Sequence, residues 1–158
     1  MRSKTVKGIA LVGLIAAATV ASIMLLAPIS YGPVQVRIGN MLALLSWYVG
    51  PWGVLGQSIG IFIANLLGPF GIVDAMFGLV NTLTTGWLIL RSRSLKVAAI
   101  WPVVWSSWIV GIMLNMLADL PFVATTCYVA VGQAITMVLA LIFWPWLDKR
   151  INLRQYRI

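Results

Sequence analysis

The chain alternates long apolar runs with short polar or proline-containing breaks. The first run covers residues 8–27, close to the ~20 residues that a helix needs to cross a bilayer. Pro28 follows it, and proline and the residue before it both resist helix formation. We therefore predict a membrane helix over residues 8–27. Because the run is longer than the apolar part of a usual signal peptide, we expect this helix to be retained.

The next apolar stretch has no charged side chain over residues 38–73. As one helix it would be ~54 Å long against a hydrocarbon core of ~30 Å, so it must fold back. Residues 50–53 (Gly-Pro-Trp-Gly) provide the break, and residues 68–71 (Gly-Pro-Phe-Gly) provide a second turn. The pattern predicts helices over residues 34–49 and 53–67. Both are short for full spans, so either they tilt little or one is partly re-entrant.

Three further apolar runs predict helices over residues 72–90, 97–117 and 122–147. A basic loop at residues 91–96 separates the first two, and an Asp-Leu-Pro turn at residues 119–121 separates the last two. The predicted fold class is therefore all-α, a polytopic membrane protein with six transmembrane helices. One domain is enough to hold the whole chain.

Composition and charge agree with a membrane protein. Hydrophobic residues make up 61% of the chain and charged residues 9%, where a soluble domain carries roughly 25% charged residues. The formal net charge of +8 does not indicate nucleic-acid binding, because the basic residues sit mostly at the N-terminus, in residues 91–96 and at the C-terminus. Such clusters are topology signals. We expect all three in the cytoplasm, and the chain in the cell membrane as a multi-pass protein.

Arg37 and Asp74 bracket the long uncharged passage. Ionisable groups inside membrane sequence are costly, so both are candidates for function. Either they form an ion pair that closes the fold, or they flank a ligand, and Asp74 also suits the dipole at a helix start. The predicted topology places both residues, and Asp119, near the outer face. That arrangement suits a binding pocket open to the outside.

Amide side chains are spread through the apolar runs. They belong to Asn40, Asn65, Asn81, Asn115 and Gln133. For any one of them, a hydrogen bond between packed helices is the usual role. Together they offer the mixed donors and acceptors that suit the edge of a nucleobase-like ring. Trp105 and Trp108 lie inside the predicted fifth helix, where one of them could stack on a flat ligand.

No catalytic set is visible in the sequence. The chain has no His, no Glu and only one Cys, Cys127, so it offers no nucleophile beside a base and no Cys/His metal site. It also lacks the glycine-rich loop that cradles nucleotide phosphates. We expect a protein that is not an enzyme and binds no metal or cofactor itself. If it transports, a partner or an ion gradient must supply the energy.

Small residues recur at four-residue spacing in the first predicted helix, as Gly13, Ala17 and Ala21. Such a face lets another helix approach closely. From the spacing alone, packing within the protein's own bundle is favoured over docking of a partner.

Several segments resemble the QueT-type substrate-binding (S) components of energy-coupling factor (ECF) transporters. They are residues 28–38 (Pro-Ile-Ser-Tyr-Gly-Pro-Val-Gln-Val-Arg-Ile), 60–65 (Gly-Ile-Phe-Ile-Ala-Asn), 74–78 (Asp-Ala-Met-Phe-Gly), Pro102 and 128–132 (Tyr-Val-Ala-Val-Gly). The resemblance implies a six-helix S component that captures a queuosine precursor, a 7-deazaguanine such as preQ0 or preQ1, from outside. A stand-alone carrier or channel, a small membrane enzyme, and an S component for another vitamin-like ligand are the alternatives.

The resemblance also implies partners and a docking face, while the candidate residues above make up the expected binding site. The partners are one transmembrane coupling protein and two ATPases, which use the ATP. In the family that the chain resembles, one face of the first helix docks on the coupling protein. The matching residues in this sequence are Gly13, Ala17 and Ala21. The expected substrate-binding residues are Arg37, Asn40, Asn65, Asp74, Trp105, Trp108 and Gln133.

Two positions depart from the family pattern. Gly39-Asn40 stands where Ser-Glu is common, and Gln133 stands where Glu is common. Each change replaces a carboxylate with an amide. A site for a cationic aminomethyl ligand would want the carboxylates, because charge-assisted hydrogen bonds are the strong ones.

Overall fold

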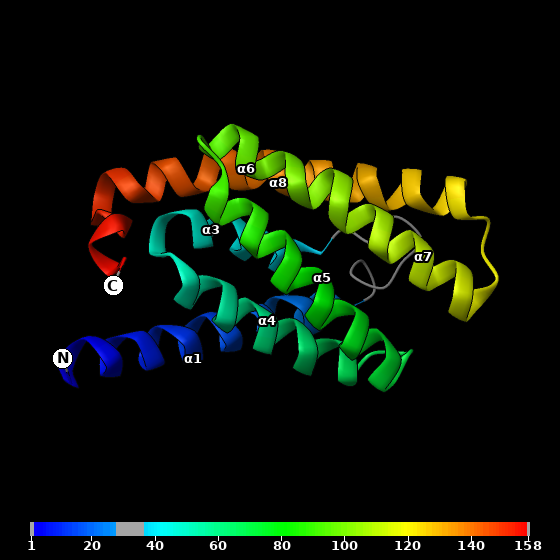
Figure 1. Cartoon of the computed structure of the whole chain (residues 1–158), viewed down its shortest axis with the longest axis horizontal. Helices are drawn as coiled ribbons and strands as arrows, with labels where there is room; N and C mark the ends of the chain where they lie inside the picture. The colour runs from blue at the N-terminus through cyan, green and yellow to red at the C-terminus, as the bar shows by residue number, and fades with distance from the viewer. Residues whose placement is uncertain (1, 28–36, 158) are drawn as a thin grey trace.

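The computed structural model describes residues 2–27 and 37–157. Across these residues all regular structure is helical, and no strand is present, so the all-α prediction is confirmed (Figure 1). The elements are α1 (Arg2–Leu25), η1 (Ile38–Asn40), α3 (Met41–Val49), α4 (Pro51–Leu66), α5 (Gly71–Arg91), α6 (Leu95–Trp101), η2 (Pro102–Ser106), α7 (Ser107–Ala118), α8 (Phe122–Ile151) and η3 (Leu153–Tyr156). The turn expected at Pro28 and the helix start expected at residue 34 lie outside the described residues.

The two predicted breaks are present, with shifted edges. Gly50 ends α3 at a φ of +80°, which glycine adopts without steric cost. Pro51 then opens α4, since a first helical residue needs no N–H. Trp52 and Gly53, expected in the turn, therefore belong to the helix. Gly71, with a φ of +57°, opens α5.

Other helix ends differ from the prediction by a few residues. α1 begins at Arg2 rather than at residue 8, because nothing in its polar start opposes a helix. α8 continues to Ile151 rather than 147, past Pro145, and ends where Asn152 turns left-handed. The predicted fifth helix is one segment of 24 residues, Leu95–Ala118. Its middle part, η2, is π-helical and begins at Pro102, because proline has no N–H for the ladder.

Four helical segments of the described chain are long and apolar enough to cross a membrane: Thr5–Leu25, Gly71–Arg91, Leu95–Ala118 and Phe122–Ile151. The segment Ile38–Val49 is shorter. Its 12 residues span ~18 Å, and the 16 residues of α4 span ~24 Å, against a core of ~30 Å. The expected count of six full spans is therefore not confirmed.

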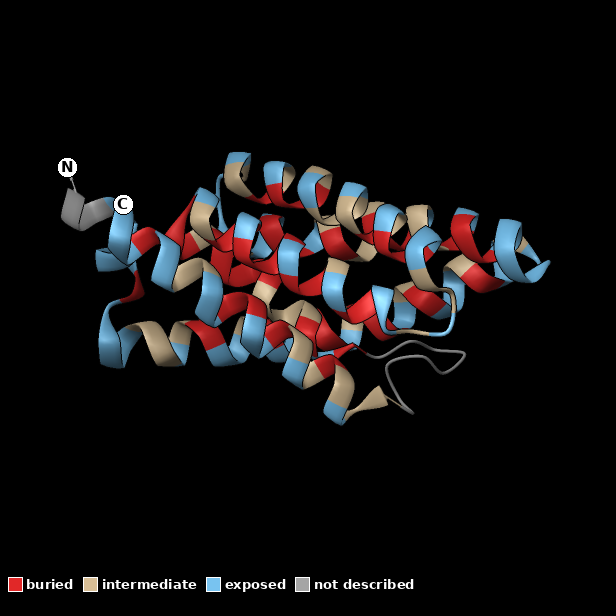
Figure 2. Ribbon diagram, turned by 90° about the horizontal axis from the view of Figure 1, so that it is seen from below, coloured by how far each residue is buried: buried red, intermediate tan, exposed pale blue. Residues whose placement is uncertain are grey.

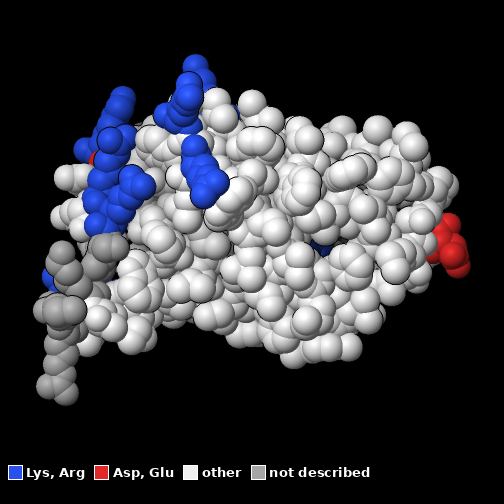
Figure 3. Space-filling view, in the orientation of Figure 1, with Lys and Arg blue, Asp and Glu red and all other residues white. Residues whose placement is uncertain are grey.

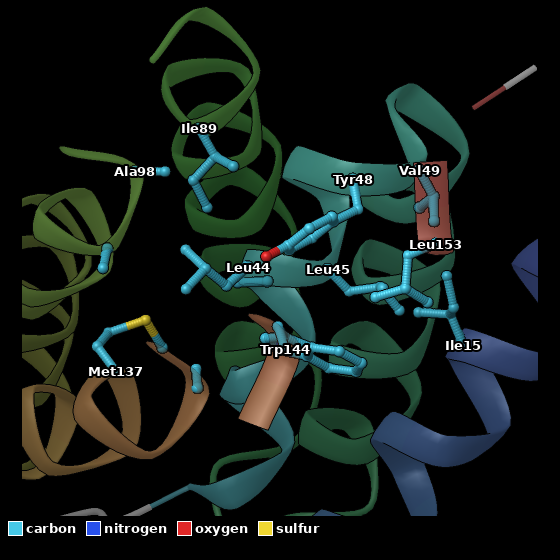
Figure 4. Packing of buried hydrophobic residues seen from close by; sticks show 13 residues of the cluster. Ile15, Leu44, Leu45, Tyr48, Val49, Ile89, Ala98, Met137, Trp144 and Leu153 are labelled. Atoms are coloured by element: carbon cyan, nitrogen blue, oxygen red, sulfur yellow. The ribbon is translucent and has the colours of Figure 1, made fainter. Parts of the chain in front are cut away.

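The short helix α3 is enclosed by the others. Its buried residues are Ala43, Leu44, Leu45, Ser46, Tyr48 and Val49. Leu44 is in one cluster with Ile89 of α5, Met137 of α8 and Trp144 of α8 (Figure 4). The Trp144 indole N–H also donates to the Met41 carbonyl at 2.7 Å. A helix that packs on every side does not need the length of a membrane span.

Close contact between α1 and α4 depends on glycines of α4. A Cβ at Gly60 would stand 2.6 Å from the Thr19 Cβ and 2.8 Å from the Ala16 carbonyl oxygen. Gly56 has the same relation to Ile15. Figure 2 shows buried residues along the inner faces of the helices and exposed ones along the outer faces. Many exposed residues are large and apolar, as at Val138 and Ile142, which suits contact with lipid.

Charged side chains gather at the ends of the molecule. Figure 3 shows Lys and Arg at the end where Figure 1 places both chain termini, and Asp at the opposite end. Arg91 lies 4.1 Å from the centre of the Trp87 ring, and Arg150 lies 4.8 Å from that of Trp146. Aromatic and basic residues together mark a membrane–water interface. The basic loop and the basic C-terminal segment thus lie at one end, as the predicted topology requires.

Candidate functional site

A small cavity of about 40 Å³ lies between the helices. It is larger than the ~10–15 Å³ that one water needs and far below the ~300–1,000 Å³ of typical ligand pockets. Its polar lining consists of Arg37, Asn40, Gln57, Asn65, Asp74, Asn81, Thr82, Thr85, Ser106 and Gln133. Inside a protein this apolar, such a concentration of polar groups marks the first candidate for a binding site.

Arg37, Asn65 and Asp74 form one hydrogen-bonded unit at the edge of the cavity. Arg37 Nη1 donates to Asn65 Oδ1 at 3.0 Å. Asn65 Nδ2 donates to Asp74 Oδ1 at 3.0 Å and to the Asp74 carbonyl at 3.1 Å. Arg37 Nη2 lies 3.8 Å from Asp74 Oδ2. All three residues are buried, so the ion pair ties the segment before α3 to α4 and α5.

The helix geometry explains why these residues meet. Asn65 is near the end of α4 and Asp74 is in the first turn of α5, so the short turn between the helices brings them side by side. Gly78, one turn further along α5, packs directly against the Asn65 amide. Any side chain at residue 78 would push that amide away from Asp74.

A second polar group joins α5 to η2. Asn81 Nδ2 donates to Ser106 Oγ at 2.6 Å, and Thr85 Oγ1 donates to Asn81 Oδ1 at 3.2 Å. Thr82 instead donates to the Gly78 carbonyl of its own helix at 2.7 Å. These bonds hold the cavity wall together across two helices. Pro102, which starts the π-helical turn, lines the same wall.

Two buried acceptors in the lining have no hydrogen-bond donor in the described structure. They are Gln133 Oε1 and Asp74 Oδ2. Gln133, on α8, is 4% exposed, and Asp74 is 2% exposed. Buried polar atoms are satisfied in the great majority of cases. Two unsatisfied acceptors in one cavity therefore require an explanation.

Five of the seven residues that we expected to bind substrate line the cavity: Arg37, Asn40, Asn65, Asp74 and Gln133. Trp105 and Trp108 are not among its lining residues. The Trp105 indole N–H donates to Thr84 Oγ1 at 2.9 Å, and Trp108 is 52% exposed. Their segment turns residues 102, 106, 109, 110 and 113 to the cavity, so helical periodicity directs the two indoles elsewhere.

Sequence reasoning did not single out every polar residue of the site. Gln57, Thr85 and Ser106 line the cavity and were not named as candidates. A signal for Gln57 existed, because it precedes Ile61 and Asn65 at four-residue intervals and so shares their helix face. Asn115, in contrast, lies outside the cavity and donates to the Leu120 carbonyl at 2.7 Å, which stabilises the turn before α8.

The small residues of α1 face outward. Gly13, Ala17 and Ala21 are exposed, and no atom lies within 4 Å of a Cβ built at Gly13. The face of α1 that packs on α4 carries Ile15 and Thr19 instead. Packing within the bundle, which the spacing alone favoured, is therefore not the role of this outward face in the described structure.

No metal site emerges from the described residues, where no group of three or more His, Cys, Asp or Glu side chains comes together. In comparisons with known proteins, a family model described as the QueT transporter matches residues 9–149. No curated protein and no solved structure matches the chain. The matched region contains all the described residues that line the cavity.

Proposed function

Because the chain belongs to the QueT transporter family, we propose that it is the substrate-capturing membrane subunit of an ATP-driven importer. Its proposed substrate is a queuosine precursor, a 7-deazaguanine such as preQ0 or preQ1. One observation carries the proposal: a cavity whose lining includes eight amide or hydroxyl side chains lies inside an otherwise apolar helix bundle. Amides and hydroxyls combine donors and acceptors, as do the edges of a purine-like ring.

Within the proposed site, Asn40, Gln57, Gln133 and the Oδ2 atom of Asp74 are the groups that contact the ligand. Arg37 and Asp74 already bond to each other through Asn65, so their main role is to hold the wall in place. The cavity of about 40 Å³ is too small for a two-ring ligand, for which pockets of ~300 Å³ or more are typical. We therefore expect the lining helices to move apart when the ligand enters.

The proposed partners are an ECF coupling protein and two ATPases. The exposed row of Gly13, Ala17 and Ala21 supports this, because small residues let a partner helix approach closely in a membrane. The row lies on the face of α1 that its own bundle leaves uncovered. ATP would be bound and hydrolysed by the partner subunits, not by this chain.

The proposed orientation puts both termini and the α5–α6 loop in the cytoplasm of the cell. It is supported by the gathering of basic residues at one end of the molecule (Figure 3) and by the preference of Lys and Arg for cytoplasmic loops. In this arrangement α3 and α4 together complete the fold as a pair of shorter membrane segments. Asp119, in the exposed turn before α8, then faces outward.

The test of the proposed function is identification of the natural ligand. The protein would be purified in a mild detergent, and co-purifying small molecules would be identified by mass spectrometry. We expect a 7-deazaguanine, and calorimetric titration should then show saturable binding of the same compound. A different co-purifying vitamin would replace the substrate assignment. Uptake by vesicles that contain this chain alone, without ATPases, would instead indicate a stand-alone carrier.

A further inference from the structure

Among the described residues, Gln133 Oε1 on α8 and Asp74 Oδ2 on α5 are buried acceptors without a hydrogen-bond donor, and Arg37 Nη2 lies 3.8 Å from Asp74 Oδ2, beyond hydrogen-bond distance. The lining donors with known bonds are directed at other lining residues: Arg37 Nη1 to Asn65, the Asn65 amide to Asp74, and the Asn81 amide to Ser106. At these two oxygens, a ligand therefore meets hydrogen-bond acceptors.

A ligand that presents its own acceptors here would leave both oxygens unsatisfied. Leaving a buried acceptor unpaired carries a desolvation penalty, whereas pairing it with a donor recovers that penalty. The two oxygens belong to different helices that line the cavity, α5 and α8. A molecule that satisfies both therefore needs donors at two separate positions on its rim.

We infer that the site recognises a flat heterocycle by its N–H groups, accepting one hydrogen bond at Gln133 Oε1 and another at Asp74 Oδ2. This inference rests on the proposed function. A 7-deazaguanine meets the requirement, because it carries N1–H and a 2-amino group on one edge and a pyrrole N–H on the other. Heterocycles with acceptors alone at these edges, and anions such as phosphates, do not meet it.

The first measurement uses the unchanged protein and three ligands. They are 7-cyano-7-deazaguanine, its 2-desamino analogue, and an analogue in which a ring oxygen replaces the pyrrole N–H. We expect each analogue to bind roughly tenfold more weakly or worse, because each has lost an N–H donor from one of the two edges. Equal affinity for all three would overturn the inference. Binding of none of them would overturn the proposed function itself.

The second measurement assigns the Gln133 contact. Gln133→Met keeps the length of the side chain and removes its acceptor. We expect the affinity for the parent ligand to fall roughly tenfold. The variant should then bind one of the two analogues as tightly as it binds the parent ligand. Gln155→Met, at an exposed position outside the cavity, is the matched control and should leave all three affinities unchanged.

A merely structural role for Gln133 would lower all three affinities together and leave their ratios as in the unchanged protein, which would refute the Gln133 contact. Circular dichroism and size-exclusion profiles would establish that Gln133→Met is folded. If this variant does not fold, the first measurement still tests the inference. It compares the affinities of the three ligands in the unchanged protein and needs no substitution.

Discussion

The guanidinium of Arg37 and the carboxylate of Asp74 lie 3.8 Å apart, and the Asn65 side chain bridges them with a hydrogen bond to each. The pair links the chain before α3 to the first turn of α5. Both residues are buried, so each charge depends on the other for compensation.

Removing one charge of this pair should destabilise the fold more than removing both. Arg37→Met leaves a buried carboxylate without its cation, and we expect a loss of about 3–5 kcal/mol in the free energy of unfolding. Arg37→Met with Asp74→Leu should recover part of that loss, because no lone charge remains. Chemical unfolding in detergent micelles measures both. If the double variant were less stable than Arg37→Met, the loss of stability would not come from a lone buried charge.

The charge of the ligand gives a second prediction. Arg37 balances Asp74, the only acid among the described residues that line the cavity, and an unpaired buried cation costs several kcal/mol. We therefore expect tighter binding of the neutral nitrile preQ0 than of the aminomethyl cation preQ1, measured by calorimetric titration. Asn40→Glu with Gln133→Glu should raise the affinity for the amine. Tighter binding of the amine by the unchanged protein would contradict this charge argument.

Partner docking can be tested on the outward face of α1. Ala17→Trp and Ala21→Trp should weaken association with a coupling protein, because a bulky indole separates helices that small residues bring together. Ligand binding should be unaffected, since neither residue lines the cavity. Co-purification of the complex measures the effect, and Ala124→Trp, also exposed but on α8, is the control. Intact complex from both α1 variants would exclude docking through this face.

The contact between α1 and α4 predicts a large difference between two glycine-to-alanine changes. Gly60→Ala places a Cβ 2.8 Å from the Ala16 carbonyl oxygen, and such overpacking costs about 1–3 kcal/mol of stability. Gly13→Ala meets nothing within 4 Å and should leave stability unchanged or raise it by up to ~1 kcal/mol, because alanine favours a helix more than glycine does. Thermal unfolding of the two variants gives the comparison. Equal stability would mean that α1 adjusts to the added methyl group.

The orientation in the membrane can be measured by cysteine labelling. In a Cys127→Ser background, Ser94→Cys places a thiol in the short loop between α5 and α6. We expect a membrane-impermeant reagent to label it only after the cells are opened, because that loop lies among the basic residues. A cysteine replacing the exposed Asp119 should react in intact cells. Labelling at residue 94 from outside would reverse the proposed orientation.

Helix positions followed from simple chemistry and could be predicted. Gly50-Pro51 and Gly68-Pro69 interrupt an otherwise continuous apolar sequence, and the structure turns at both. The enclosure of α3 was not predictable in this way. An apolar helix looks the same in sequence whether lipid or protein surrounds it, so only the tertiary packing of Leu44 distinguishes a core helix from a membrane span.

In the candidate site, the residue types could be predicted from the sequence, but their contacts could not. Asn65 and Asp74 were identifiable because polar groups are rare in such a sequence. Their mutual hydrogen bonds were not, because spacing along the chain does not show which atoms meet. Trp105 illustrates the opposite error: an aromatic residue suits a flat ligand chemically, but the direction of its helix face decides where the ring lies. Here that direction leads to Thr84.

The position of α4 has one further consequence. On one side it packs on α1 through Gly56 and Gly60, and on another it contributes Gln57 and Asn65 to the cavity wall. A single rigid helix thus separates the outward face of α1 from the ligand cavity. If a partner on α1 displaces α4, the two binding events are thermodynamically linked, and linkage is reciprocal. Whatever factor the partner imposes on ligand affinity, the ligand must impose on partner affinity.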